Sequence, residues 1–271
     1  MNPIIRWAGS KKALLPTLRQ YWGDHKRYIE PFCGSGCLFF SIEPQGGVLG
    51  DINADLMGTY EALRDDPTRV AEYLLKLPAN KEIYYKLRAQ NPLRLSEVGR
   101  AARFLFLNRL CFNGIYRTNL DGQFNVPYGP QKKKSRKVKF DPDFLMKASD
   151  LLRRVSLVRG DFEKTLSHAE EGDFVYMDPP YAVSGRRIFS EYHPESFSVT
   201  DLRRLREMLK ELDQKGAHFI ISYADSTEGR ALVDGWHTRR IRTRRNVAGF
   251  AGHRRSAYEI LASNLEPSVC Q

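Results

Sequence analysis

The segment Asp178-Pro179-Pro180-Tyr181 places a carboxylate, two prolines and an aromatic ring directly after the apolar run 174–177. An aromatic amine is a poor nucleophile, and two acceptors that take both of its hydrogens would draw the nitrogen toward a tetrahedral, attacking geometry. The carboxylate of Asp178 and the carbonyl of Pro179 are suited to this. The prolines stiffen the loop, and Tyr181 offers a face for stacking a base. We assign all four residues to a candidate catalytic loop, with a plain Asp-Pro turn as the alternative.

A second segment, residues 31–36, has the sequence PFCGSG, and Asp51 ends the next apolar run. Glycines let a backbone approach a ligand closely, and an acid at the end of the next strand can accept hydrogen bonds from ribose hydroxyls. The loop has only two glycines where a dinucleotide fingerprint has three, which disfavours nicotinamide and flavin. The segment 7–12, WAGSKK, lacks the spacing of a nucleoside-triphosphate loop. The pattern therefore indicates a nucleoside site.

Short apolar runs alternate with helical stretches along the chain, which predicts a parallel sheet covered by helices. Such a sheet would bring these segments together. The expected strands are 27–32, 47–50, 155–158, 174–177 and 217–222, followed by a late pair at 236–242 and 258–263. We expect an α/β fold with a Rossmann-like sheet and a ligand crevice beyond the carboxyl ends of its strands. Four leucines at helical spacing predict a helix over 201–212, with Thr200 as its N-cap.

Roughly a hundred residues separate the second and third expected strands, far more than an ordinary connection. Helical patterns occur at 54–64, 68–77, 81–88 and 98–110. Asp121-Gly122 then predicts a hairpin, and the run Lys132–Lys139 predicts a mobile basic loop. The expected organisation is a catalytic domain in two parts, 1–56 and 151–271, with a target-recognition insertion at 57–150.

The composition favours a polyanionic partner, because the formal net charge is +11 and the sequence pI is about 9.5. Nucleic acid and an anionic membrane would both fit. No run of about 18 apolar residues occurs, and the first residues lack a signal-peptide core, so we expect a cytoplasmic protein that does not bind a membrane. Cys33 and Cys37 are interpreted as reduced residues flanking the glycine loop, and the six histidines show no metal-ligand spacing. We expect no metal.

In their order along the chain, these segments resemble the Dam-like, alpha-group family of DNA adenine-N6 methyltransferases. WAGSK at 7–11 comes first, then FCGSG at 32–36, an insertion, and DPPY at 178–181. The resemblance covers nearly the whole chain. It implies transfer of a methyl group from S-adenosyl-L-methionine to N6 of a flipped adenine in double-stranded DNA. It also implies a methyltransferase sheet that carries a helical and β-hairpin recognition domain.

The resemblance places eight residues at the cofactor: Trp7, Lys11, Phe32, Gly34, Gly36, Asp51, Asp161 and Asp178. Asp51 would hold the ribose hydroxyls and Asp161 the cofactor adenine. Ser10 and Ser35 stand where many members have glycine, and Tyr223 stands in place of an asparagine. These departures bear on cofactor affinity rather than on the fold.

Residues 112–119 and 124–129 resemble the recognition hairpin of members that act on GATC. The guanidinium of Arg117 matches the O6 and N7 acceptors of guanine, with a phosphate contact as the alternative. The residues assigned to DNA are Arg6, Phe112, Asn113, Ile115, Arg117, Asn119, Pro127 and Tyr192, the last near the flipped base. A late arginine cluster favours phosphate contact and comprises Arg239, Arg240, Arg242, Arg244, Arg245, Arg254 and Arg255.

Several alternatives stay open at this point. The catalytic loop would also suit cytosine N4, an RNA adenine or a protein glutamine as acceptor, although the recognition hairpin and the positive charge disfavour a protein. A catalytically silent DNA-binding relative is a further alternative, and the intact Asp178 argues against it. A monomer and a restriction nuclease partner are both compatible with the sequence.

Overall fold

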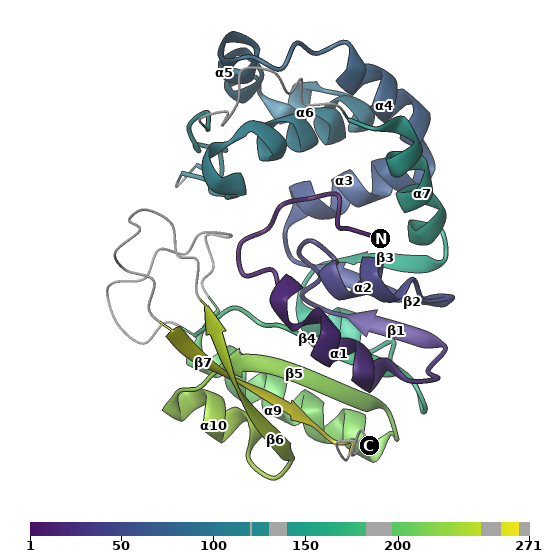
Figure 1. The fold of residues 1–271 in the computed structure, drawn as a ribbon, viewed down its shortest axis with the longest axis vertical. Coiled ribbons are helices and arrows are strands. Elements are labelled where there is room, and N and C mark those ends of the chain that lie inside the picture. Colours follow the sequence, from purple (N-terminus) through teal and green to yellow (C-terminus); the bar gives the residue numbers. More distant parts are fainter. Residues whose placement is uncertain (120, 130–139, 183–196, 245–255, 266–271) are drawn as a thin grey trace.

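The computed structural model of the 271-residue chain describes residues 1–119, 121–129, 140–182, 197–244 and 256–265. These residues contain a seven-stranded sheet with the order β3-β2-β1-β4-β5-β7-β6 (Figure 1). Its strands are β1 (Arg27–Glu30), β2 (Gly46–Asp51), β3 (Val155–Arg159), β4 (Phe174–Met177), β5 (His218–Ala224), β6 (His237–Arg244) and β7 (Ser256–Ser263). Strands β1 to β5 pair in parallel, and β7 runs antiparallel between β5 and β6. The expected α/β Rossmann-like fold is confirmed.

The helices cover both faces of this sheet (Figure 1). They are α1 (Leu15–Trp22), α2 (Cys37–Ile42), α3 (Ala54–Asp65), α4 (Pro67–Leu75), α5 (Lys81–Ala89), α6 (Glu97–Leu110), α7 (Pro142–Leu152), α8 (Phe162–Leu166), α9 (Val199–Gln214) and α10 (Thr227–Val233). Every helix expected from the apolar spacing is present. Short helices without a long apolar period, such as α2 and α8, gave no such signal.

The predicted N-cap of α9 was wrong by two residues. The helix begins at Val199, and the side chain of Ser198 accepts a hydrogen bond from the backbone N–H of Asp201, 3.2 Å away. The carboxylate of Asp201 accepts one in return from the backbone N–H of Ser198, 2.8 Å away. This reciprocal capping box satisfies two free backbone donors at once, so it fixes the helix start ahead of Thr200.

Successive side chains of the central strands point to opposite faces and enter two separate cores. Ile29 and Val175 pack with the leucines of α9, whereas Tyr28 and Phe174 pack with α1 and α2 on the other face. All four positions of β4 are buried. A strand covered on both faces has a continuous apolar sequence, and for this reason the bounds of β4 could be predicted from the sequence.

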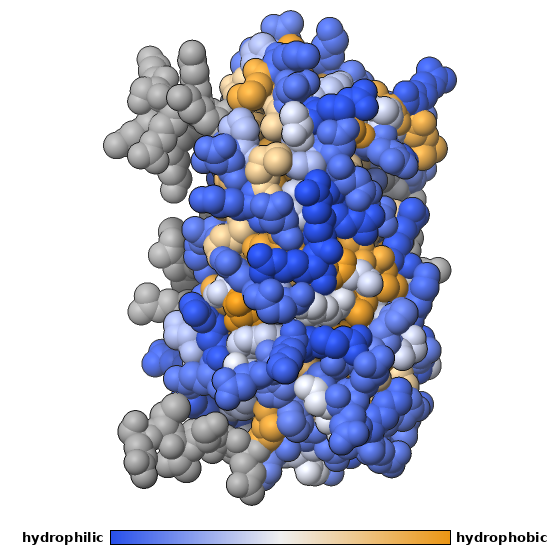
Figure 2. Space-filling view, turned by 90° about the vertical axis from the view of Figure 1, so that its right-hand side faces the viewer, coloured by the Kyte–Doolittle hydropathy of each residue, from blue (hydrophilic) through white to orange (hydrophobic). Residues whose placement is uncertain are grey.

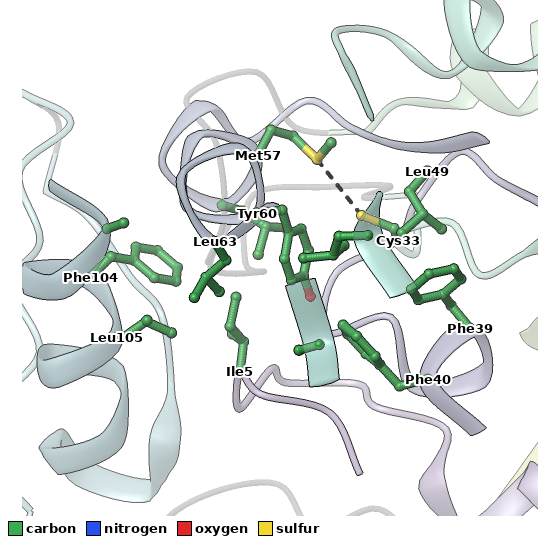
Figure 3. Close-up of a cluster of buried hydrophobic side chains, with 14 of the residues drawn as sticks. Ile5, Cys33, Phe39, Phe40, Leu49, Met57, Tyr60, Leu63, Phe104 and Leu105 are labelled. Carbon is green, nitrogen blue, oxygen red and sulfur yellow. Dashed lines mark hydrogen bonds between the residues drawn. The ribbon is translucent and has the colours of Figure 1, made fainter. Parts of the chain in front are cut away.

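The core beneath α2 continues into the insertion without a break. Figure 3 shows Phe40 of α2, Tyr60 and Leu63 of α3, and Phe104 and Leu105 of α6 gathered in one cluster. Truncating such a fully buried aromatic residue to alanine typically costs about 3–5 kcal/mol. The helices of the insertion are thus anchored to the sheet by packing. The expected boundaries at 56/57 and 150/151 fall inside α3 and α7, and the division into domains stays a prediction.

The hairpin predicted at Asp121-Gly122 is present as a chain reversal with isolated bridges rather than regular strands. Thr118 pairs with Phe124, and Cys111 pairs with Tyr128. The side-chain oxygen of Asn119 accepts hydrogen bonds from the backbone N–H groups of Asp121 and Gln123, at 3.1 and 2.8 Å. The backbone N–H of Asn119 also donates to the carbonyl of Gln123 at 2.9 Å, so backbone and side-chain bonds of Asn119 together close the reversal.

Figure 2 shows one side of the molecule, where hydrophilic side chains cover most of the surface and apolar ones gather only in small patches. Within the described ranges, no helix is both long and apolar enough to cross a bilayer. The basic run Lys132–Lys139 and the arginines Arg245, Arg254 and Arg255 lie outside the described residues.

Candidate active site

The two motifs meet at the point where the strand order reverses. Strands β1 and β4 are neighbours in the centre of the sheet, and the chain leaves them toward opposite edges. The glycine loop 31–36 follows β1, and Asp178 follows β4. In open α/β sheets, ligands bind beyond the carboxyl ends of the strands at such a switch point. The topology therefore brings the candidate cofactor loop and the candidate catalytic loop to one edge.

The glycine loop is folded tightly against the end of β2. The backbone N–H of Gly34 donates to Oδ2 of Asp51 at 3.0 Å, and that of Cys33 donates to the carbonyl of Gly50 at 2.9 Å. Gly34 and Gly36 have φ values of 45° and 59°, in the left-handed region that side chains other than glycine rarely adopt. The sequence thus places glycine where the turn requires it.

Trp7 covers this loop from the N-terminal segment. A Cβ atom at Gly34 would come within 2.7 Å of Cδ1 of the indole, so no other residue fits beneath the ring. The indole also stacks on Tyr116, with ring centroids 5.4 Å apart. The phenol of Tyr116 donates to Oδ2 of Asp55 at 2.8 Å. Trp7 therefore links the glycine loop to the insertion.

Asp178 is held by two donors that come from distant parts of the chain. Nζ of Lys11 lies 2.7 Å from its Oδ1, and Oγ of Ser222 on β5 donates to the same oxygen at 2.9 Å. The side chain of Asp178 is 19% exposed, so its carboxylate is partly accessible from outside the protein. The sequence assigns Lys11 to the cofactor, whereas nothing in the sequence singles out Ser222.

Contacts with β5 and β7 hold the rest of the candidate catalytic loop. The phenol of Tyr181 donates to Oε1 of Glu259 at 3.2 Å, and the backbone N–H of Ala182 donates to the phenol oxygen of Tyr223 at 2.7 Å. The rings of Tyr181 and Tyr223 meet edge to face, with centroids 5.3 Å apart. Tyr223 thus braces the loop.

Lys11 carries a buried positive charge among these groups. Burial by itself would lower the pKa of its ammonium, but attraction to Asp178, Tyr181 and Glu259 outweighs burial and raises that pKa above its ordinary value. Oε2 of Glu259 lies 3.8 Å from Nζ. Lys11 therefore stays protonated across the neutral range.

Glu30 is a buried carboxyl group that the sequence analysis did not single out. It ends β1, and its side chain is 3% exposed. Within the described ranges its Oε2 has no hydrogen-bond partner. Burial raises the pKa of Glu30 well above its usual value; the phenol of Tyr28 opposes this rise, and the carboxylates of Asp178 and Asp51 add to it. A buried acceptor without a donor is costly, so this atom marks a place where a ligand donor would be favourable.

An aromatic wall and an ion-pair cluster lie beyond β3. The ring of Phe32 packs against Phe162, with centroids 5.4 Å apart. Asp161 caps α8, since its Oδ1 accepts from the backbone N–H of Glu163 at 3.0 Å. The guanidinium of Arg204 lies 2.8 Å from the same oxygen. Asp161 thus lies beyond the carboxyl end of β3, and its carboxylate already binds the backbone of Glu163 and the guanidinium of Arg204.

Residues 7–247 match the family described as D12 class N6 adenine-specific DNA methyltransferase. The chain belongs to this family. It is therefore a DNA methyltransferase specific for adenine, which sets aside cytosine N4, RNA and protein acceptors and a silent binder.

Curated relatives resemble the chain over nearly its whole length. The Type II methyltransferase M1.LlaDCHI of Lactococcus lactis subsp. cremoris is 35% identical over 274 residues, which cover 97% of this chain and 95% of that protein. The Type II methyltransferase M.MjaIII of Methanocaldococcus jannaschii is 33% identical, covering 97% and 99%. The DNA adenine methylase of Salmonella typhi is 30% identical, covering 96% and 94%.

Most of the residues that the sequence assigns to DNA lie on the insertion and the N-terminal segment. The side chain of Arg6 packs on Gly114, and its Nη1 donates to the carbonyl of Arg109 at 3.2 Å. Phe112 is 37% exposed, and Asn113 is exposed with a φ of 55°. Arg6 and the loop that contains Phe112 are thus neighbours, so both could contact the same stretch of DNA.

Arg117 points its guanidinium along the hairpin. Its Nε donates to Oδ1 of Asn125 at 3.0 Å, and its carbonyl accepts from the backbone N–H of Asn125 at 3.1 Å. Ile115 is half-buried, Pro127 is exposed, and the side chain of Asn119 is occupied by the turn. Their contacts to DNA stay predictions. Tyr192 lies outside the described residues.

The two cysteines beside the glycine loop are buried. Cys33 and Cys37 are buried free thiols, and burial raises the pKa of each. In the part of the chain that the structure describes, no group of three or more His, Cys, Asp or Glu side chains could hold a metal ion.

Proposed function

We propose that this DNA methyltransferase uses S-adenosyl-L-methionine to methylate N6 of a flipped adenine in the sequence GATC. One observation carries the proposal. The acceptor loop that begins at Asp178 and the glycine loop around Gly34 lie at the same switch point of the sheet, between β1 and β4. A nucleoside cofactor and an amine acceptor would therefore meet there.

The residues at the glycine loop fit this cofactor. S-adenosylmethionine carries an α-ammonium group, and the orphaned, buried Oε2 of Glu30 is an acceptor for such a donor. Asp51 at the end of β2 would hold the ribose hydroxyls, and the face of Phe32 would take the adenine. When bound, the cofactor supplies a methyl group on a sulfonium centre. Asp161 would contact the cofactor adenine. Because Arg204 already forms an ion pair with Asp161, we expect this ion pair to persist when the cofactor binds.

The acceptor side uses the protein's own groups. The carboxylate of Asp178 and the carbonyl of Pro179 would accept the two hydrogens of the adenine amine and localise its lone pair on nitrogen. Pro180 keeps the loop rigid and adds no competing donor. Tyr181 would stack on the flipped base, because the target amine cannot enter a pocket while the base is paired in the helix.

The proposed target follows from the recognition hairpin. Arg117 would read guanine, Asn113 and Ile115 would contact other base edges, and Phe112 would wedge beside the vacated position. Its 37% exposed ring supports a wedge. The monomeric state, the nuclease partner and the cytoplasmic location expected from the sequence stay predictions.

Two measurements test the proposal. Titration of the protein with S-adenosylmethionine in a calorimeter should show one site, and Glu30→Gln should weaken it at least about tenfold, the order expected for a buried charge-assisted hydrogen bond. Sequencing of methylated bases in exposed DNA should place the marks at GATC. Methylated bases that concentrate at another sequence would contradict GATC as the target. Absence of a binding signal in the titration would contradict S-adenosylmethionine as the methyl donor.

A further inference from the structure

Both hydrogen-bonding partners of Asp178 approach the same oxygen. Lys11 Nζ and Ser222 Oγ lie 2.7 and 2.9 Å from Oδ1. Among the described residues, no donor reaches Oδ2. A carboxylate has acceptor capacity on both oxygens, so this asymmetry leaves one oxygen fixed and the other available.

The two donors are themselves held in place. Ser222 is fully buried on β5, and the phenol oxygen of Tyr176 lies 3.4 Å from its hydroxyl. The side chain of Lys11 is only 10% exposed, and Glu259 flanks its ammonium. Because Glu259 also accepts the hydrogen bond of Tyr181, the lysine, the carboxylate and the catalytic loop form one connected network.

We infer that Lys11 and Ser222 are positioning residues, which hold Oδ1 of Asp178 and so direct Oδ2 to the adenine amine. The inference rests on the proposed function and assigns Lys11 to the acceptor side of the site rather than to the cofactor. A carboxylate pinned through one oxygen has no remaining freedom to rotate about its terminal bond, so its other lone pairs are oriented before substrate arrives.

The charge of Lys11 supports this role. The raised pKa of Lys11 keeps the ammonium protonated, so the ion pair persists through the neutral range. A permanently charged donor beside Oδ1 also compensates the negative charges of Asp178 and Glu259. Without it, these two carboxylates would repel each other in a partly buried site. Ser222 adds a neutral donor from a different element, which fixes the direction that the flexible lysine alone would leave open.

Five variants test the inference: Ser222→Ala, Lys11→Met, Lys11→Arg, the double variant Lys11→Met with Glu259→Gln and, as the matched control, Lys12→Met. Lys12 is exposed and bonds Asn2 at 3.2 Å. The rate of methyl transfer in a single turnover is measured with saturating DNA and S-adenosylmethionine, and the affinity for S-adenosylhomocysteine is measured by calorimetry. We expect the rate to fall about tenfold in Ser222→Ala and about a hundredfold in Lys11→Met, because misplacement of a reacting group is costly. The affinity should stay within about twofold in both, since the cofactor loop is untouched.

Lys11→Arg should recover part of the rate, and Lys12→Met should match the wild type. The double variant Lys11→Met with Glu259→Gln guards against misfolding, because it also removes the buried negative charge that Lys11 would no longer compensate, and it should be as slow as Lys11→Met. A loss of cofactor affinity in Lys11→Met with an unchanged saturated rate would overturn the inference. Wild-type protein that methylates no adenine with this donor would instead overturn the proposed function.

Discussion

The indole of Trp7 lies against Gly34 so closely that a Cβ atom there would come within 2.7 Å of the ring. Gly34→Ala should therefore displace either Trp7 or the glycine loop, and its φ of 45° adds strain. We expect cofactor affinity to fall at least about tenfold, measured by calorimetry, because backbone approach to the ligand depends on this turn.

Gly58→Ala is the matched control for that change. Gly58 lies in α3, and a Cβ atom added there would meet nothing within 4 Å. Alanine favours a helix over glycine by about 1 kcal/mol, so this variant should unfold at the same or a higher temperature and bind cofactor normally. Unchanged affinity in Gly34→Ala would show that the indole contact does not shape the site.

Tyr223→Phe removes one hydroxyl that accepts the hydrogen bond of Ala182, at 2.7 Å, and keeps the ring against Tyr181. Loss of a buried hydrogen bond typically costs about 1 kcal/mol. Thermal unfolding should reveal that loss, and the saturated rate of methyl transfer should fall because the catalytic loop is less constrained. Tyr258→Phe, at an exposed position, is the control. Equal rates for the two variants would argue against bracing by Tyr223.

Glu30 predicts a pH-dependent stability. Because burial raises the pKa of Glu30 in the folded protein, the folded state binds more protons than the unfolded state above the ordinary carboxyl value of 4.5. The contribution of Glu30 to folding stability therefore falls as pH rises from that value through the folded pKa. The glutamine of Glu30→Gln cannot ionise. The unfolding temperature of this variant should therefore rise relative to that of the wild type as pH increases.

The control for this effect is Glu211→Gln, an exposed carboxyl on α9. Its unfolding temperature should track that of the wild type across the same pH range. A constant difference between Glu30→Gln and the wild type at all pH values would mean that Glu30 ionises normally in the folded protein.

Arg117 predicts how the enzyme selects its sequence. Nε is engaged by Asn125, and among the described residues no acceptor takes the Nη hydrogens, which leaves that edge for DNA. If Arg117 reads guanine, Arg117→Ala should relax discrimination at one base pair by about 1–3 kcal/mol. A phosphate contact would instead weaken all sequences alike and flatten the salt dependence of binding. Arg19→Ala, an exposed arginine on α1, controls for lost charge.

The sequence predicted the sheet well because its signals are local. Strand β4 is a continuous apolar run, and Asp178 follows it directly. Ser222 and Glu259 could not be predicted in this way, because a lone serine or glutamate on a strand has no distinguishing pattern. Ser222 reaches Asp178 across 44 positions, through the pairing of β4 with β5, and only the order of the strands reveals that proximity.

The role of Lys11 illustrates the same limit. Its neighbours in WAGSKK indicate a loop near the cofactor, but its ion pair with Asp178 depends on where the N-terminal segment crosses the sheet. The position of Thr200 before the leucine period favours it as N-cap, whereas the capping box of Ser198 depends on the residue three positions later. Local pattern thus predicts elements more reliably than it predicts contacts.

The central claim is that Asp178 activates an adenine amine for methylation from S-adenosylmethionine. Duplex DNA containing GATC is incubated with labelled S-adenosylmethionine and either wild-type protein or Asp178→Ala, digested to nucleosides and separated by mass. We expect labelled N6-methyladenine from the wild type, at least about a hundredfold less from Asp178→Ala, and similar DNA affinity for both proteins. Label on another base, or a variant that keeps more than about a tenth of the wild-type rate, would contradict the claim.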